Sequence, residues 1–195
     1  MKMLQKLTIR ILSLRKGIDM LKIRNSVFET NSSSSHSIVV TKENQMQENV
    51  DPEWYMSDDG EIHFWCEDDL EFGRTPFDIL NDWHGRLRYT IASMGETHMD
   101  EIVSACKRHI PGFDHFKFPH SKWDDGGNVL GYVDHQSFGL LRHTLNTHHI
   151  SVEDFIFNDK YLVIIDGDEY RVFDRLRDSL LFTDEEIDYM EEAND

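Results

Sequence analysis

The apolar run Tyr161–Ile165 constrains the fold of this chain more than any other segment. A short run of this kind, rich in β-branched residues and followed by a turn signal, predicts a β-strand. The turn signal is Asp166-Gly167, and we expect residues 170–173 beyond it to form the second strand of a hairpin. Three further strands are expected at 36–41, 61–66 and 113–118, with the first two paired.

An apolar stripe with spacings of three and four residues follows Thr75-Pro76, a pair that is typical of the start of a helix. The stripe predicts a helix to about residue 94, where Gly95 ends it, and a second helix at 98–109. Three more helices are expected, at 138–148 after the N-cap Ser137, around 155–157 after the N-cap Ser151, and beyond Thr183. Because helices and hairpins follow no regular βαβ order, the predicted fold class is α+β, with a small mixed or antiparallel sheet and several packed helices.

A run of small polar side chains, Asn31 to Ser35, lies between the apolar pair Val27-Phe28 and a predicted strand. Four consecutive serines are also typical of a linker. The apolar segments on both sides favour burial, however, and His36 closes the run. An ordered, hydroxyl-rich turn between two buried segments indicates a specific purpose, such as binding an anion or presenting a nucleophile.

Two chemical interpretations of this run stay open beside a structural one. In the first, a serine of the run is a nucleophile, and His36 or His135 is its base. In the second, the hydroxyl and amide groups of the run hold a phosphate while His36 donates a proton. In the structural interpretation the hydroxyls cap the backbone amides of a rigid turn, and the spacing of a nucleophile elbow is absent.

The tetrapeptide Asp134-His135-Gln136-Ser137 directly precedes a predicted helix. Its polar groups can line a cleft in which Asp134 orients His135, although adjacent residues rarely pair in this way and Asp134 can serve another group. The structural alternative is an N-cap motif with Ser137 as the cap. The candidate catalytic residues are Ser34, Ser35, His36, Asp134 and His135. The candidate substrate-binding or phosphate-binding residues are Asn31, Ser32, Ser33, Gln136 and Ser137.

The chain contains 11 histidines, and imidazole is both the usual acid–base group near neutral pH and a common metal ligand. The group that includes Asp114, His115 and His120 matches no standard zinc or two-metal spacing, so a solvated loop is favoured. We therefore expect no cofactor, with a divalent metal ion, which no standard motif supports, as the alternative. The aromatic residues at 113–118 are expected to lie in the core and not to stack on RNA bases. Cys66 and Cys106 form no CxxC pair and are expected to be reduced thiols.

The formal net charge of −17 disfavours broad, nonspecific binding of DNA. It favours docking on a basic surface. The expected partner is a host protein or ribonucleoprotein with such a surface, RNA is a further expected partner, and no membrane is expected.

Residues 1–19 are expected to be translated upstream sequence ahead of a start at Met20, or else a basic amphipathic extension. Arg10 interrupts their apolar residues, so neither a membrane span nor a signal peptide is predicted. Residues 20–195 are expected to form a single α+β domain.

Residues 22–37 read Lys-Ile-Arg-Asn-Ser-Val-Phe-Glu-Thr-Asn-Ser-Ser-Ser-Ser-His-Ser. This segment resembles the N-terminal signature of a family of small, largely uncharacterised phage and prophage proteins. Stretches at 131–137 and 154–158 are similar to the same family, and the resemblance covers most of the chain from about residue 20 to about residue 170. It implies a mobile-element origin and a place in the cytoplasm of a bacterial host cell. The family lends no established activity, so no residue role is carried over from it.

The expected function is counter-defence, of an anti-CRISPR-like kind, or host takeover, directed at a host nucleic-acid-processing complex. One mode is cleavage of the RNA of that complex by a nuclease or other phosphoryl-transfer activity that uses histidine acid–base groups. The other mode is purely stoichiometric inhibition by an acidic protein without catalysis. A virion accessory protein is a third alternative, which the absence of repeats and coiled-coil heptads disfavours.

Overall fold

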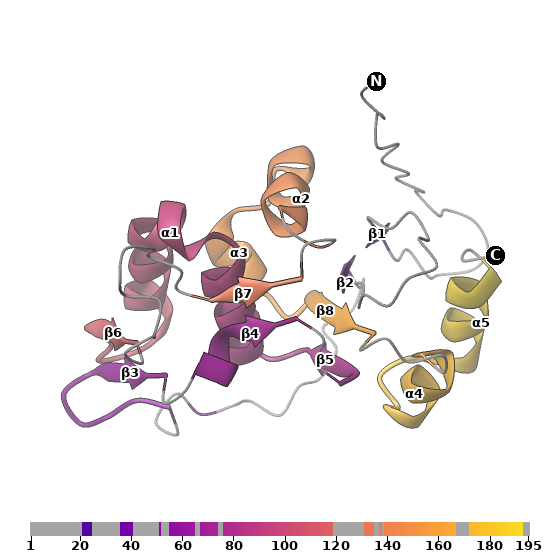
Figure 1. The fold of residues 1–195 in the computed structure, drawn as a ribbon, viewed down its shortest axis with the longest axis horizontal. Helices are drawn as coiled ribbons and strands as arrows, with labels where there is room; N and C mark the ends of the chain where they lie inside the picture. The colour runs from indigo at the N-terminus through magenta and orange to yellow at the C-terminus, as the bar shows by residue number, and fades with distance from the viewer. Residues whose placement is uncertain are drawn as a thin grey trace.

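The computed structural model of the chain centres on a four-stranded antiparallel sheet with the strand order β1–β2–β8–β5 (Figure 1). The strands are Leu21–Arg24 (β1), His36–Val40 (β2), Asp78–Leu80 (β5) and Tyr161–Ile165 (β8). The structure describes residues 21–24, 36–40, 51, 55–64, 67–73, 76–118, 131–134, 137, 139–166 and 172–192. The strands β2 and β8 pair along their whole length, from His36 opposite Ile165 to Val40 opposite Tyr161.

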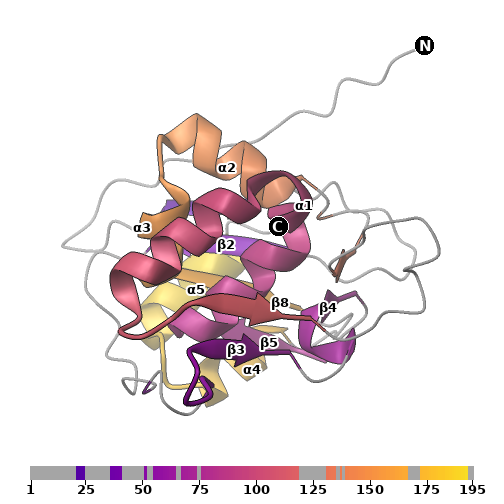
Figure 2. The same cartoon turned by 90° about the vertical axis from the view of Figure 1, so that its left-hand side faces the viewer.

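Helices cover both faces of this sheet (Figure 1). The helices α1 (Trp83–His109), α2 (Leu140–His148) and α3 (Val152–Phe157) lie on one side, and α4 (Val172–Asp178) and α5 (Asp184–Glu192) lie on the other. After a quarter turn of the molecule, α1 is seen beside α2 (Figure 2). Because both faces of the sheet are covered, all five residues of β8 are buried, which explains why this strand is apolar without alternation.

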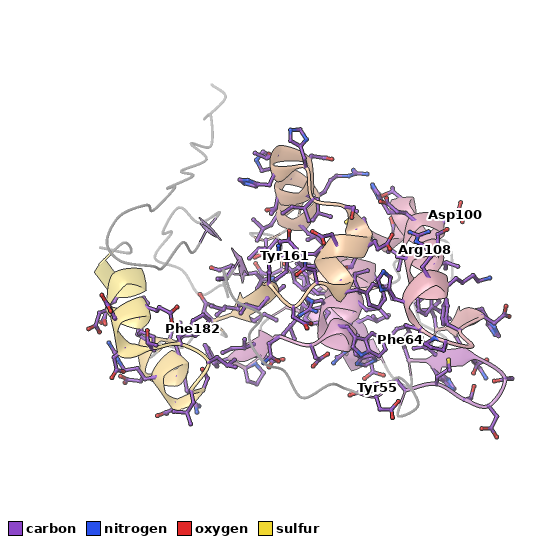
Figure 3. The ribbon with its side chains drawn as sticks, turned by 180° about the vertical axis from the view of Figure 1, so that it is seen from behind. Tyr55, Phe64, Asp100, Arg108, Tyr161 and Phe182 are labelled. Atoms are coloured by element: carbon purple, nitrogen blue, oxygen red, sulfur yellow. The ribbon has the colours of Figure 1, made fainter. Side chains whose placement is uncertain are left out.

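The alternation of side chains along β2 divides the core into two clusters. Ile38 packs with the cluster on the α1 side, and the next residue, Val39, packs with the cluster on the α4–α5 side. Phe64 belongs to the first cluster and Phe182 to the second, and Figure 3 shows them on opposite sides of the molecule. Since His36 precedes Ile38 by two residues, its side chain lies on the α1 side of the sheet.

Two short parallel pairs complete the strands. Glu61–His63 (β3) pairs with His115–Lys117 (β6), and Glu71–Phe72 (β4), which follows the 3-10 helix Glu67–Leu70, pairs with Tyr132–Val133 (β7). The predicted pairing of 61–66 with 36–41 is therefore wrong, because β3 has β6 as its neighbour. The mixed arrangement of helices and strands confirms the predicted α+β class.

The helix that was predicted to begin near residue 75 begins at Trp83, where Asp82 is the N-cap and its Oδ1 accepts a hydrogen bond from a backbone N–H. Residues 78–80 form β5 instead. Ile79 packs on the α4–α5 side and Leu80 on the α1 side, so these neighbours face opposite directions as in a strand. Apolar residues at spacings of three fit a strand–turn–helix junction as well as a continuous helix. For this reason the apolar stripe placed the start of the helix too early.

The two helices predicted on either side of Gly95 are one helix with a kink. α1 continues through Gly95, which is buried, and departs from helical geometry only at His98, whose φ is −129°. The predicted hairpin strand at 170–173 is wrong as well, because α4 begins at Val172 and buries Leu176 against the sheet. The strand β8 has β2 and β5 as its neighbours.

The predicted N-caps of two helices are confirmed. The hydroxyl of Ser151 accepts a hydrogen bond from the N–H of Asp154 at 3.0 Å at the start of α3. At the start of α5, the N–H of Glu186 donates to Thr183 Oγ1 at 3.3 Å, and the N–H of Thr183 donates to Glu186 Oε2 at 2.7 Å. This reciprocal pair is a capping box. Among the helices of the described residues, none has the length and apolar character that crossing a membrane requires.

Candidate functional site

Four buried polar residues from three distant parts of the chain meet between the sheet and α1, and we call them the His36 cluster. His36 is the first residue of β2, Tyr89 lies in α1, and Asp134 and Ser137 lie in the loop between β7 and α2. Their exposed fractions are 1% for His36, 0% for Tyr89 and 3% for each of the other two. Polar groups buried this deeply are normally hydrogen-bonded, so the contacts of the cluster show how these groups are satisfied.

His36 contacts the cluster through both its backbone and its ring. Its backbone N–H donates a hydrogen bond to Ser137 Oγ at 3.1 Å. Its Nδ1 lies 3.1 Å from the hydroxyl oxygen of Tyr89, and the two rings meet edge to face with centroids 5.6 Å apart. The other ring nitrogen, Nε2, is buried and has no hydrogen-bond partner in the described part of the chain.

The loop that carries Asp134 and Ser137 is tied to the small β4–β7 pair. The N–H of Asp134 donates to the carbonyl of Phe72 at 2.9 Å, and the N–H of Ser137 donates to the carbonyl of Asp134 at 2.8 Å. The prediction that Ser137 caps the following helix is wrong. α2 begins at Leu140 after Gly139, which has a φ of 80° and makes no side-chain cap, and the Ser137 hydroxyl instead binds the distant amide of His36.

Burial keeps His36 neutral at pH 7. Burial lowers the pKa of His36 from 6.5 to about 4, and the charges of Asp134 and Asp166 act in the opposite direction. A neutral imidazole has one N–H donor and one acceptor nitrogen. Burial also raises the pKa of the Tyr89 hydroxyl, which therefore stays protonated. The cluster thus holds neutral hydrogen-bonding groups beside nearby carboxyl groups.

The structure brings together three of the predicted site residues, namely His36, Asp134 and Ser137. The other predicted site residues lie outside the described residues: Asn31, Ser32, Ser33, Ser34, Ser35, His135 and Gln136. Tyr89 was missed by the sequence analysis. A tyrosine in a helix with an apolar stripe carries no local signal of its own, since its partner lies 53 residues away in the chain.

A second buried polar group, Arg86, ties α1 to α3 and β8. Its side chain is fully buried, its Nε donates to the carbonyl of Ile156 at 2.9 Å, and its Nη1 donates to the carbonyls of Tyr161 at 2.9 Å and Asn81 at 2.6 Å. Its Nη2 lies 3.5 Å from the half-exposed carboxylate of Asp159. Burial lowers the pKa of Arg86, whereas the charge of Asp159 raises it. These contacts satisfy backbone carbonyls and give Arg86 a structural role.

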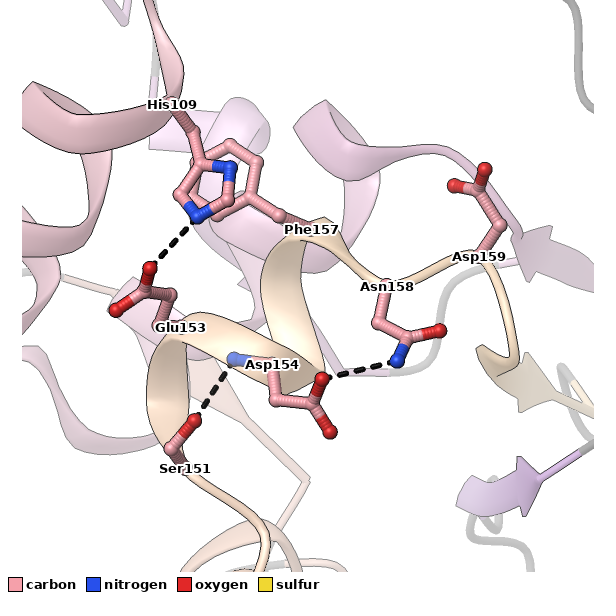
Figure 4. A pocket seen from close by; sticks show the side chains of 7 residues that line it. All are labelled: His109, Ser151, Glu153, Asp154, Phe157, Asn158 and Asp159. Carbon is pink, nitrogen blue, oxygen red and sulfur yellow. Dashed lines mark hydrogen bonds and ion pairs between the residues drawn. The ribbon is translucent and has the colours of Figure 1, made fainter.

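A polar pocket of about 460 Å³ lies beside α3 and the end of α1 (Figure 4). Its lining residues are His109, Ser151, Glu153, Asp154, Phe157, Asn158 and Asp159. Glu153 binds Arg108 and also His109 at 2.7 Å, and these two contacts hold the pKa of its carboxyl at about 2. Asp154 accepts hydrogen bonds from the Tyr161 hydroxyl and the Asn158 amide, both at 2.9 Å. Glu153 and Asp154 therefore already have partners, and their contacts tie α3 to the end of α1 and to Tyr161 of β8.

The structure describes the aromatic segment and part of the metal-ligand group that the sequence singled out. No group of three or more histidine, cysteine, aspartate or glutamate side chains in the described residues is arranged to hold a metal ion. His115 contacts Asp114 at 3.1 Å and Glu61 at 3.3 Å, while His120 lies outside the described residues. Phe116 packs on Phe64 within the core, as expected for a structural aromatic residue.

Cys106 is a free, buried thiol, and burial raises its pKa to about 12. Its thiolate is therefore negligible at neutral pH, and a nucleophilic role for Cys106 is disfavoured. Cys66 lies outside the described residues. Comparison of the chain with protein-family models, with curated proteins and with solved structures gave no match.

Proposed function

We propose that the protein is a counter-defence or host-takeover protein of a phage or prophage that acts on a host nucleic-acid-processing complex. The observation that carries this proposal is that the stretches at 22–37 and 131–137, which resemble the phage family, meet in the buried His36 cluster. The net charge of −17 adds support, because an acidic protein is attracted to the basic surfaces that bind nucleic acids.

The mode that we favour is cleavage of RNA in that complex. In metal-free RNA cleavage, the 2′-hydroxyl oxygen attacks the neighbouring phosphorus while its proton passes to a base. The bond to the 5′-oxygen then breaks, and that oxygen takes up a proton. His36 is proposed to hold the phosphate together with the serine run. His135, oriented by Asp134, is proposed to take the proton of the 2′-hydroxyl and to return it to the 5′-oxygen as that oxygen leaves. Nε2 of His36 is buried and has no hydrogen-bond partner among the described residues, and this supports the mode because a polar atom left unpaired at that depth is costly.

Stoichiometric inhibition is the second candidate, and the charge of the α4–α5 unit favours it. Exposed carboxylates on this unit are Asp174, Asp178, Asp184, Glu185, Asp188 and Glu191. They outnumber the two arginines of the same segment, Arg175 and Arg177. An acidic surface of this kind can occupy the nucleic-acid channel of a host protein without any chemistry. Among the described residues, no structural feature favours a virion accessory role.

The proposal is tested by a plating assay. The full chain is expressed in bacteria that carry one of a panel of RNA-guided or restriction systems, and each strain is challenged with a phage that its system restricts. We expect plaque formation to be restored against at least one system. Loss of protection in His36→Ala, with the fold retained, supports catalysis. Loss in a variant that neutralises Asp184, Glu185 and Asp188 supports stoichiometric docking. Undiminished restriction in every strain, with the protein soluble and folded, would overturn the proposal.

A further inference from the structure

We infer that His36 carries its proton on Nε2, that Tyr89 is the positioning residue that fixes this tautomer, and that the ring therefore offers a hydrogen-bond donor to its site. The tautomer follows from contacts within the described residues. The use of the donor, which is to hold an oxygen of a phosphoryl group, rests on the proposed function.

The direction of the hydrogen bond between Tyr89 and His36 follows from the surroundings of the tyrosine hydroxyl. Tyr89 is fully buried, so its O–H must find an acceptor within the protein. In the described part of the chain, His36 Nδ1, at 3.1 Å, is the acceptor within hydrogen-bond distance. The Ser93 hydroxyl lies one turn further along α1 and opposes the effect of burial on the pKa of Tyr89, but it makes no hydrogen bond of suitable distance and angle with any described residue. Tyr89 therefore donates to Nδ1 of His36.

The position of the imidazole proton follows from this direction. A neutral imidazole has one protonated and one unprotonated nitrogen, so a ring that accepts at Nδ1 carries its proton on Nε2. His36 is neutral because burial lowers its pKa to about 4. Its Nε2–H is buried and has no acceptor among the described residues. A buried N–H without an acceptor fits a site that receives an oxygen atom from a ligand.

The ring of Tyr89 is itself held in place. Phe72 of β4 packs edge to face against it, with centroids 5.2 Å apart, and the guanidinium of Arg88 lies 5.7 Å from the centre of the Phe72 ring. Because α1 fixes the backbone of Tyr89 and Phe72 fixes its ring, the hydroxyl is set at Nδ1 before any ligand arrives. Such preorganisation is what a donor in a binding site requires.

The inference is tested by nuclear magnetic resonance on the full chain with 15N-labelled histidine at pH 7. We expect Nε2 of His36 to appear as a protonated nitrogen and Nδ1 as an unprotonated nitrogen that receives a hydrogen bond. In Tyr89→Phe, the Nδ1 signal should move to the position of a nitrogen without a hydrogen bond, and the single tautomer should become a mixture. The matched control is Tyr161→Phe, which removes a hydroxyl that donates to Asp154 and should leave the His36 signals unchanged.

A protonated Nδ1 in the wild-type protein, or His36 signals that do not respond to Tyr89→Phe while the fold is retained, would overturn the inference. This readout does not depend on activity. A correct tautomer without counter-defence activity would refute the proposed function alone, and a wrong tautomer would refute the inference whatever the plating assay shows.

Discussion

Replacement of Arg86 by methionine tests how the two helical layers and the sheet are held together. The substitution keeps an unbranched side chain of similar length in the core but removes the donors to the carbonyls of Ile156 and Tyr161. Each buried acceptor that loses its partner costs about 1–3 kcal/mol, and the release of a buried charge offsets part of this loss. We therefore expect the free energy of unfolding to fall by about 3 kcal/mol.

In a thermal scan of a chain of this size, that loss corresponds to a fall in Tm of about 6–12 °C. The matched control is Asp159→Asn, which removes only the ion pair to Arg86. Because the Asp159 side chain is 49% exposed, this variant should lose less than about 1 kcal/mol. A Tm for Arg86→Met equal to that of the wild-type protein, or a larger effect for Asp159→Asn than for Arg86→Met, would show that these hydrogen bonds do not supply the stability assigned to them.

Three further predictions concern pH, a cap and a turn. Burial lowers the pKa of His36 and of His84 from 6.5 to about 4, so between these values the unfolded chain binds more protons than the folded chain. The free energy of unfolding should be fully retained above pH 6.5 and should fall by about 3 kcal/mol per histidine as the pH is lowered toward 4. A urea midpoint that stays constant over this pH range would contradict the lowered pKa values. Thr183→Ala should cost about 1 kcal/mol in a urea titration because it breaks the capping box of α5, and no loss would contradict the cap. Gly60→Ala should cost more than Gly139→Ala. Both glycines have φ near 80°, but only at Gly60 would the added Cβ overlap a backbone carbonyl, and equal Tm values would contradict this.

The sequence predicted the strands that are buried on both faces better than the elements beside them. The run Tyr161–Ile165 is apolar throughout because helices cover both sides of β8, so its pattern has one interpretation. The segment that begins at Val172 has no such constraint. A turn followed by apolar residues fits a hairpin or a helix, and the burial of Leu176 against the sheet decides in favour of the helix. That contact is tertiary, so no local pattern contains it.

The same distinction holds for the candidate site. His36 and Ser137 were predicted because polar residues beside apolar segments are conspicuous in a sequence, and the structure places them in one cluster. Tyr89 and Arg86 were not predicted, since polar residues in an amphipathic helix are ordinarily assigned to its exposed face. Apart from the carbonyl of Asn81 close to Arg86, their hydrogen-bond partners lie between 53 and 75 residues away along the chain, and only the packing of α1 on the sheet and α3 reveals them.

The proposal that the His36 cluster acts on RNA is tested most directly by a turnover assay. The full chain, well below stoichiometry, is incubated with end-labelled guide RNA in its purified host complex, beside His36→Ala and the exposed-surface control His143→Ala, with the fold of each checked by circular dichroism. We expect several equivalents of defined fragments per protein molecule for the wild type and for His143→Ala, and none for His36→Ala. Intact RNA with folded wild-type protein, or equal cleavage by His36→Ala, would contradict it.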